Sequence, residues 1–347
     1  MFGKSKYYSY LYKNTYKMID SLLFSLDGRE DISDKIIKSA NSFSENVSDD
    51  TKKGNLRIQK FSDGELCVDF IDSVRNRRVY LLSSPNTSDE LMKLNLAIDA
   101  AKRGSAKEIV VIIPYFPYAR QDKKDQSRGP IGAKIIAEMI EQRGATSVIT
   151  YDLHADQIQG FFNIPLTHIE GKNVFDDYIY ALHYSGMNNI ILCGPDAGSG
   201  KRVKRMKDQL ADKYGINVNY VMLDKTRKEA NVIEDMVIIG NVKGKDVIIL
   251  DDMVDTAGTL CKAAEVLIEN GAKSVRAIIS HGILSGPAYN RIDDSMLTEL
   301  IISDSLESMV MEKIAVFSVS EQIGMAIAAN NLGLSYDTLK SSKKIYI

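Results

Sequence analysis

The sequence has little cysteine and no apolar run long enough to cross a membrane. Cys67, Cys193 and Cys261 are its three cysteines; they lie far apart, with no CxxC spacing. This usage excludes a disulfide framework and a zinc ribbon and is typical of a reducing compartment. The longest apolar stretch, residues 109–118, contains two prolines and falls short of the roughly 20 residues that a membrane span needs. The Tyr- and Lys-rich start of the chain does not resemble a signal peptide. We therefore expect a cytoplasmic protein without a membrane segment.

An excess of charge of either sign is also absent. The chain has 44 Lys and Arg against 46 Asp and Glu, a formal net charge of −2 over 347 residues. A protein that coats nucleic acid normally carries a strong basic excess, so we expect no nucleic-acid partner. Hydrophobic residues make up 44% and charged residues 26%, as in folded globular proteins. At roughly 150 residues per domain, the length favours two domains.

One pattern recurs in both halves of the chain: a helical segment, a glycine, and a short apolar run. Glycine readily provides the left-handed residue that follows a helix. A short run that is apolar on both faces is typical of a parallel strand buried between helices. The copies span residues 103–113, 143–151, 185–192 and 270–279. This alternation predicts an α/β fold with two similar domains, each a mostly parallel sheet flanked by helices.

Four further segments have recognisable patterns. Residues 1–20 read as an added N-terminal arm, and the polar segment 42–55 reads as a loop or insert. Residues 56–70 alternate apolar and polar side chains around Asp-Gly, which predicts a hairpin. Residues 320–331 predict a helix whose N-cap is a serine.

The most specific chemical signal follows the apolar run 247–250. It contains a carboxylate pair and then a small-residue, hydroxyl-bearing turn: Asp251, Asp252, Asp255, Thr256, Ala257, Gly258 and Thr259. Such a turn between a strand and a helix cradles phosphate with backbone N–H groups and the positive helix end. The carboxylates would repel that phosphate, so they suit sugar hydroxyls or a metal. This combination describes ribose 5-phosphate; the alternative is an acidic turn capped by threonines.

The string DDMVDTAGT resembles the phosphoribosyl-pyrophosphate loop of type I phosphoribosyltransferases. Six further strings resemble one branch of that group, the ribose-phosphate pyrophosphokinases (phosphoribosyl-pyrophosphate synthetases). They are FSDGE (61–65), YFPYARQDKKDQSR (115–128), DLHADQIQGFF (152–162), GPDAG (194–198), LDKTR (223–227) and LSGPA (284–288). In order and spacing the resemblance covers roughly residues 56–330.

The resemblance implies transfer of the pyrophosphoryl group of Mg-ATP to the 1-hydroxyl of ribose 5-phosphate. It also implies two domains of the type I phosphoribosyltransferase fold: an ATP-side domain, residues 21–168 with a C-terminal helix at about 321–347, and a ribose-5-phosphate domain, residues 169–320. The active site would lie between them. Dimers built into hexamers are the expected assembly.

Roles for the remaining candidate residues follow from the same resemblance. His154 and Asp196, each just after an apolar run, would hold Mg2+, with a bound water easing the contact to His154 because magnesium prefers oxygen. ATP would be bound by Arg120 and Gln121 together with the hairpin of a neighbouring subunit, which supplies Phe61, Asp63 and Glu65. The residues themselves leave plainer alternatives open: a structural histidine, a solvated basic loop and an ordinary Asp-Gly turn.

Lys225 and Arg227 follow the apolar run 219–223 and enter a polar stretch. Cations on a mobile loop can neutralise charge that builds up on a polyphosphate, so we expect them to be the catalytic pair; the alternative is an exposed loop. The family usually has DKRR followed by proline, and here Thr226 and Lys228 depart from that pattern.

Three other functions stay open at this point. One is the same transfer to a larger acceptor such as ADP-ribose, which the N-terminal arm, the 42–55 insert and Ser199 leave possible. A second is a phosphoribosyltransferase that consumes the pyrophosphate, which should lack the ATP-related strings. The third is a non-catalytic regulatory homologue, which should have lost catalytic positions.

Overall fold

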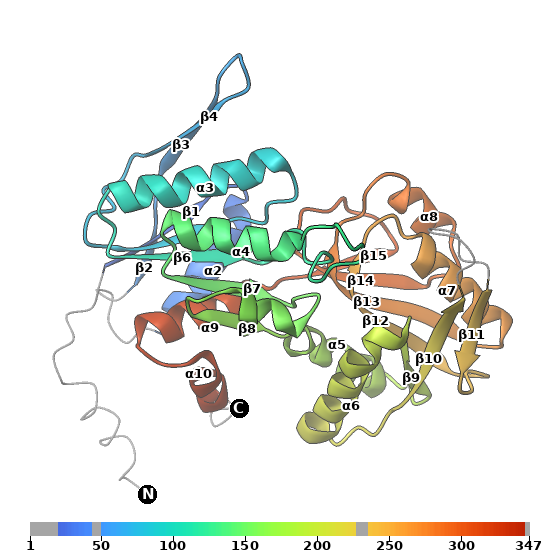
Figure 1. Cartoon of the computed structure of the whole chain (residues 1–347). Coiled ribbons are helices and arrows are strands. Elements are labelled where there is room, and N and C mark those ends of the chain that lie inside the picture. Colours follow the sequence, from blue (N-terminus) through green and yellow to red (C-terminus); the bar gives the residue numbers. More distant parts are fainter. Residues whose placement is uncertain (1–19, 44–49, 227–234, 344–347) are drawn as a thin grey trace, which may run out of the picture.

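Two mostly parallel sheets, each flanked by helices, lie side by side in the computed structural model (Figure 1). The structure describes residues 20–43, 50–226 and 235–343. The predicted N-terminal arm therefore lies outside the described residues, apart from Asp20. The predicted fold class, α/β with two sheet-and-helix domains, is confirmed by these sheets.

The first sheet is parallel throughout. Within the described residues it has six strands in the order β2-β1-β5-β6-β7-β8. Their bounds are β1 Ser21–Ser25, β2 Thr51–Lys53, β5 Arg78–Leu82, β6 Glu108–Ile113, β7 Ser147–Tyr151 and β8 Leu166–Ile169. Residues 109–113 are almost completely buried, as expected for a strand covered on both faces.

The second sheet contains seven strands of the described chain, in the order β11-β10-β9-β12-β13-β14-β15. Only the β10–β11 pair is antiparallel. The bounds are β9 Ile190–Gly194, β10 Asn219–Thr226, β11 Asp235–Ile239, β12 Asp246–Val254, β13 Ser274–Gly282, β14 Glu299–Ser303 and β15 Ile314–Phe317.

Helices cover both sheets (Figure 1). They are α2 Glu30–Asn41, α3 Ser88–Arg103, α4 Gly132–Arg143, α5 Lys172–Tyr184, α6 Gly200–Tyr214, α7 Gly258–Glu269, α8 Ala288–Asp294, α9 Ser320–Asn331 and α10 Tyr336–Lys343, with short 3-10 helices η2 Asp156–Phe161 and η3 Ala197–Ser199. Helix α3 begins with a capping box: the Thr87 hydroxyl accepts from the N–H of Glu90, whose carboxylate accepts from the N–H of Thr87. Among the described residues, no helix is long and apolar enough to cross a membrane.

One of the three buried apolar clusters among the described residues spans both halves of the molecule. A single buried cluster contains Leu23 and Ile149 of the first sheet, Leu192 and Ile248 of the second, and Ile323 of α9. Helix α9 comes from the end of the chain yet packs against α2 near its start. The junction between the sheets is therefore a packed apolar interface.

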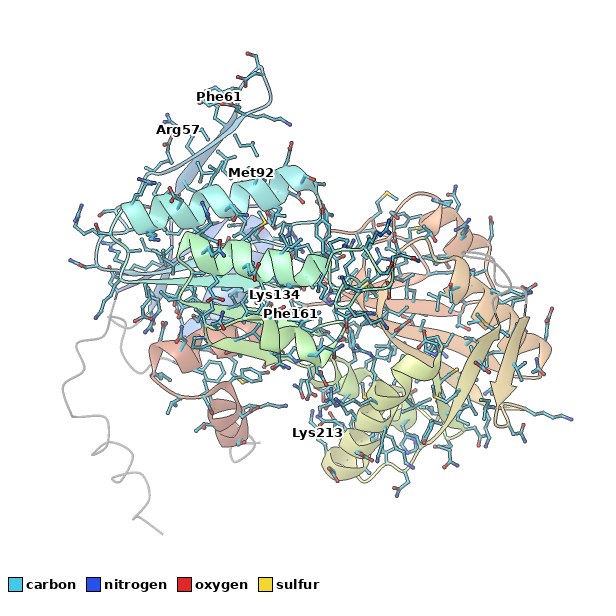
Figure 2. All side chains as sticks on the ribbon, viewed as in Figure 1. Arg57, Phe61, Met92, Lys134, Phe161 and Lys213 are labelled. Atoms are coloured by element: carbon cyan, nitrogen blue, oxygen red, sulfur yellow. The ribbon has the colours of Figure 1, made fainter. Side chains whose placement is uncertain are left out.

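The hairpin predicted for residues 56–70 is confirmed: β3 Leu56–Lys60 pairs antiparallel with β4 Leu66–Phe70. It extends from the body of the molecule, with Phe61 near its tip (Figure 2). Gly64 at the turn has φ +96°, a conformation that favours glycine.

Four details of the predicted elements were wrong. Residues 51–53 of the expected loop form edge strand β2. The helix at 320–331 has no side-chain cap, because Ser320 is already its first helical residue and Val319 occupies the cap position. Strand β10 continues past Leu223 because it pairs with β11, and β12 continues through the Asp251-Asp252 pair because β13 pairs with it that far.

Candidate active site

The ends of strands from the two sheets meet at a contact between His154 and Asp252. His154 follows β7, and its Nδ1 donates to Asp252 Oδ2 of β12 at 2.7 Å. The hydrogen bond to Asp252 raises the pKa of His154 above its ordinary value. Burial alone would raise the pKa of Asp252, but the bond from His154 and the charge of Arg202 hold it low. The contact therefore joins the predicted ATP side to the predicted ribose side.

The pKa of Asp251, the residue before Asp252, is shifted in the opposite direction. Asp251 precedes Asp252 on β12, and its Oδ1 accepts from the N–H of Asp252 at 3.0 Å. Burial, then the charges of Asp252 and Asp196, raise the pKa of Asp251 well above its ordinary value. Three carboxylates thus lie within electrostatic reach of one another, an arrangement that a cation would stabilise.

The predicted phosphate loop joins β12 to α7. Ala257 precedes the helix in a left-handed conformation with φ +59°. The first N–H groups of α7 have no partner within the helix, as at any helix start, and they can bind an anion. Thr256 is exposed and Thr259 is half-buried. The loop is therefore placed to receive a phosphate from outside the sheet.

Arg291 is a neighbour of this loop that the sequence did not indicate. It lies on α8, and its Nη1 donates to the Thr256 carbonyl at 2.9 Å. A Cβ on Gly258 would come within 3.4 Å of the same nitrogen. An exposed arginine on a short helix carries no motif, so only the folded chain reveals this contact.

The basic segment after β6 also reaches the loop. Both Nη atoms of Arg120 lie 3.0 Å from Asp255 Oδ2, and the Ser285 hydroxyl donates to the same carboxylate. Burial alone would raise the pKa of Asp255, but the bonds from Ser285 and Arg120 lower it. The folded chain therefore brings a predicted ATP residue against a predicted ribose residue.

Gln121 is held close to the start of α4. A Cβ on Gly132 would lie only 2.5 Å from Gln121 Oε1, and the Gln121 carbonyl accepts from the N–H of Ala133 at 3.2 Å. Further along α4, Lys134 Nζ donates to the Phe161 carbonyl at 3.0 Å; both residues are labelled in Figure 2. These bonds tie α4 to η2, which follows His154.

Within one chain, the hairpin does not join this group. Figure 2 shows Phe61 far from the junction of the sheets. Phe61 is 45% exposed, and Asp63 and Glu65 are exposed as well. Three of the predicted ATP-binding residues are thus separated from Arg120 and Gln121 in the single chain.

Asp196 and Lys225 lie at strand ends of the second sheet. Asp196 follows β9, and its Oδ1 accepts from the N–H of Ser199 at 3.0 Å. The Ser199 hydroxyl in turn donates to the Asp196 carbonyl at 2.6 Å. Ser199, which departs from the family pattern, therefore stabilises the turn that follows β9. Lys225 belongs to β10, where its backbone pairs with Met236. Arg227 lies outside the described residues.

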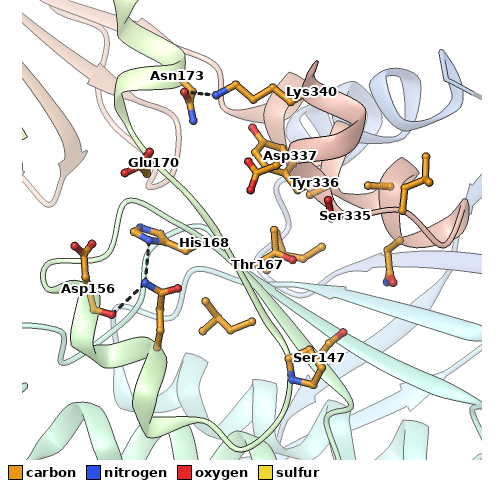
Figure 3. Close-up of a pocket in the computed structure, with 18 of the residues that line it drawn as sticks. Ser147, Asp156, Thr167, His168, Glu170, Asn173, Ser335, Tyr336, Asp337 and Lys340 are labelled. Carbon is orange, nitrogen blue, oxygen red and sulfur yellow. Dashed lines mark hydrogen bonds between the residues drawn. The ribbon is translucent and has the colours of Figure 1, made fainter. Parts of the chain in front are cut away.

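Of two cavities lined by described residues, only the smaller includes a predicted site residue. One of about 250 Å³ lies beside His154 and is also lined by Lys201 and Arg202. The other, of about 550 Å³, lies between β8 and the C-terminal helices, where Figure 3 shows His168 and Tyr336 on its walls. His168 borders both cavities. Its Nε2 accepts from the N–H of Leu153 at 3.0 Å.

The donor set fits magnesium. His154 and Asp196 come from opposite sheets, and the charges of Asp252 and Asp196, which raise the pKa of Asp251, favour a cation. No group of three or more metal-binding side chains is placed in the described part of the chain to hold an ion alone. Magnesium commonly takes one or two carboxylates and completes its shell with waters and substrate phosphates.

The two parallel sheets and the loop between β12 and α7 define an α/β protein of the phosphoribosyltransferase class. Two family sequence models match. The one described as the N-terminal domain of ribose phosphate pyrophosphokinase matches residues 21–144, and the one for the phosphoribosyl transferase domain matches residues 167–310.

Individual relatives agree with this class. A ribose-phosphate pyrophosphokinase of Oceanobacillus iheyensis is 42% identical over 319 residues, covering 90% of this chain and 95% of the relative. One of Porphyromonas gingivalis is 46% identical over 276 residues, covering 79% and 86%. The solved phosphoribosylpyrophosphate synthetase of Mycobacterium smegmatis superposes with a TM-score of 0.80 at 32% identity, covering 90% and 98%. The chain belongs to the ribose-phosphate pyrophosphokinase family, as the sequence motifs predicted.

Proposed function

We propose that the protein transfers the β,γ-pyrophosphoryl group of ATP to the 1-hydroxyl of ribose 5-phosphate. The ribose oxygen forms a bond to the β-phosphorus, the bond from that phosphorus to the oxygen bridging it to the α-phosphate breaks, and the hydroxyl proton is released. The products are AMP and 5-phosphoribosyl 1-pyrophosphate. The family and the names of the curated relatives support this reaction. The observation that carries it is the contact of His154 with Asp252, which joins the two halves of the site.

Each substrate has its own set of residues in this proposal. Thr256–Thr259 hold the 5-phosphate through backbone N–H groups and hydroxyls, while Asp251, Asp252 and Asp255 meet the ribose side. Arg120 and Gln121 bind ATP, since an arginine can stack on adenine and also reach a phosphate. Phe61, Asp63 and Glu65 complete the ATP site from a neighbouring subunit.

Charge neutralisation and positioning then carry the transfer. Such reactions depend on alignment of donor and acceptor more than on a strong base. Lys225 and Arg227 neutralise the charge that builds on the migrating group. His154 and Asp196 would hold the Mg2+ of Mg-ATP, which supplies positive charge against the polyphosphate when bound.

We also propose domain limits and an assembly. The ATP-side domain spans residues 21–168 and includes the C-terminal helices from about 321, because α9 packs on α2. The ribose-5-phosphate domain spans residues 169–320. The exposed hairpin tip supports a homo-oligomer, dimer or hexamer, with the ATP site at a subunit interface, and we expect the assembly in the cytoplasm.

Release of AMP tests the proposal. Protein with Mg-ATP and ribose 5-phosphate should release AMP and form the pyrophosphate in equal amounts, and either substrate alone should give none. Faster AMP release with ADP-ribose would show that ADP-ribose, and not ribose 5-phosphate, is the preferred acceptor. Consumption of added 5-phosphoribosyl 1-pyrophosphate with a nucleobase would instead indicate a transferase, and no turnover under any condition would indicate a regulatory homologue.

A further inference from the structure

A buried polar contact lies beside the His154–Asp252 contact and also joins the two sheets. Asp152 is the first residue after β7, and its side chain is only 7% exposed. Its carboxylate accepts from Arg202 Nη1 of α6 and from the Ser280 hydroxyl of β13. It also accepts from the N–H of Gly171 at 3.1 Å. One carboxylate of the first sheet is therefore bound by two elements of the second.

The backbone of Asp152 is held in an unusual conformation. Its φ is +42°, a left-handed value that persists in a non-glycine residue only where the surroundings impose it. Its N–H donates to the Ile169 carbonyl at 2.8 Å, and its carbonyl accepts from His281 Nε2 at 3.1 Å. Since His154 follows two residues later, the direction in which the chain leaves Asp152 sets where His154 lies.

The atoms around the Asp152 carboxylate leave no room for a side chain at Gly171. A Cβ added to Gly171 would lie 2.6 Å from Ser280 Oγ and 2.8 Å from Asp152 Oδ2. Contacts below 3.0 Å do not occur without a shift of the neighbours. The close approach of the two sheets at this point therefore depends on glycine here.

Arg202 is the side chain that connects the three segments carrying the site. It lies in the first turn of α6, directly after the turn that contains Asp196. It binds Asp152 on the segment that leads to His154. Burial alone would lower the pKa of Arg202, but the charges of Asp152, Asp252 and Asp251 raise it, so the guanidinium is also within electrostatic reach of the carboxylate pair of β12.

From this geometry we propose that Arg202, through its buried contact with Asp152, is a positioning residue that fixes the His154 segment against Asp252 and Asp196. It does not touch the reacting atoms. This inference rests on the proposed function for its kinetic test, but the alignment itself has a readout that does not require activity.

Three substitutions separate alignment from simple loss of stability. Arg202→Met removes the contact and leaves Asp152 buried without its cation. Adding Asp152→Asn to Arg202→Met removes that charge and should restore the melting temperature. Arg202→Lys keeps a cation that can reach Asp152. Lys204→Met, at an exposed position of the same helix, is the matched control for loss of a positive charge.

We expect Arg202→Met to lower kcat about 100-fold, since misplacement of a reacting group by about 1 Å can have that effect. Arg202→Lys should recover part of kcat. Binding of ribose 5-phosphate without ATP, measured by calorimetry, should change far less than kcat, because Arg202 acts on Asp251 and Asp252 only through their charge and does not touch the phosphate loop. The double variant should regain its melting temperature while kcat stays low.

The imidazole of His154 provides the readout independent of activity. Its 15N signals, assigned by their loss in His154→Gln, should show the Nδ1 hydrogen bond in the native protein and its weakening in Arg202→Met. If Arg202→Met proves too unstable to study, Gly171→Ala disturbs the same contact from the other side and should change the same signals.

Two results would overturn the inference: a native kcat and His154 spectrum in folded Arg202→Met, or recovery of kcat together with melting temperature in the double variant. A native protein that releases no AMP from ATP and ribose 5-phosphate would refute the proposed function alone, and the His154 spectra would still decide the role of Arg202.

Discussion

At the scale of single residues, the structure pairs side chains of the predicted site and its surroundings across the junction of the two sheets. His154 faces Asp252, Arg120 faces Asp255, and Arg202 faces Asp152. Each pair joins residues 50 or more positions apart in the sequence. Consequently, a substitution on one side of the junction changes the electrostatic environment on the other.

Loss of the catalytic cations is the first test at this scale. Replacing both Lys225 and Arg227 by alanine should lower kcat by about 100-fold or more, because preorganised charges at the reacting group contribute that much. Affinity for ribose 5-phosphate should stay close to native, since the phosphate loop is separate. Steady-state kinetics and calorimetry measure the two quantities, and an unchanged kcat would refute the assignment of this pair.

Buried histidines predict a dependence of stability on pH. Burial lowers the pKa of His281, which lies among Tyr115, Tyr151 and Ser305 and near the charges of Asp152, Asp252 and Arg202. Because the unfolded chain binds a proton more readily at this position, the contribution of His281 to the free energy of unfolding should be largest above about pH 6.5 and fall below it, by up to about 1.4 kcal/mol per pH unit. The raised pKa values of His154 and Asp251 act in the opposite direction, so the contribution of His281 is the difference between the native protein and its variant.

Urea denaturation at pH 7.5 and pH 5.5 measures this decline. In His281→Gln the decline should be smaller, because the amide can still donate to the Asp152 carbonyl but cannot take up a proton. The burial that lowers the pKa of His168 should leave a residual decline in that variant. Equal declines in the native and variant proteins would contradict the prediction.

At the scale of elements, paired strands determine where the functional segments begin. The β10–β11 ladder brings Lys225 into a strand, and the β12–β13 pairing brings Asp251 and Asp252 into another. The β3–β4 hairpin, in contrast, packs little of its tip against the rest of the chain, as the exposed Phe61 shows. An element of this kind suits contact with a second subunit.

Mixing of inactive variants tests whether the hairpin completes a neighbour's site. Asp63→Ala with Glu65→Ala should lose ATP affinity, and so should Arg120→Ala. When the two proteins are dissociated and reassembled together, part of the activity should return, because some sites then combine an intact hairpin with an intact Arg120. If mixed oligomers form and remain inactive, the hairpin does not act across subunits.

At the scale of the whole molecule, helix α9 packs back against α2 near the start of the chain. Gly324 of α9 approaches α2 so closely that a Cβ would lie 2.5 Å from Ser39 Cβ and 2.8 Å from Ala40 N. The chain must therefore pass through both sheets before its first sheet is fully covered. Helix α2 is therefore covered by a helix that follows the second sheet in the sequence.

Gly324→Ala should destabilise the protein by roughly 1–3 kcal/mol, the usual effect of inserting a methyl group into a filled contact. Gly160→Ala is the control, because nothing lies within 4 Å of a Cβ at that position. The free energy of unfolding from denaturant titration gives the comparison. Equal values for the two variants would show that α9 can move away from α2 without loss.

The sequence by itself determined the fold class, the hairpin and the family. These properties follow from local features of the sequence. Apolar runs predict buried strands, glycines predict the ends of helices, and the seven motifs and their order identify the family. The ends of β10 and β12 were predicted wrongly from the sequence. A strand extends as far as its partner does, and pairing with a distant segment cannot be predicted from one segment alone.

Only the tertiary structure decided which distant side chains meet. Arg291 beside the phosphate loop, Arg120 against Asp255, and Asp152 between Arg202 and Ser280 have no local pattern. Their partners come from other strands and helices, and one apolar cluster that spans both sheets holds these elements together. The sequence places charged side chains at the ends of strands. The packing of the two sheets determines which of those side chains lie next to each other.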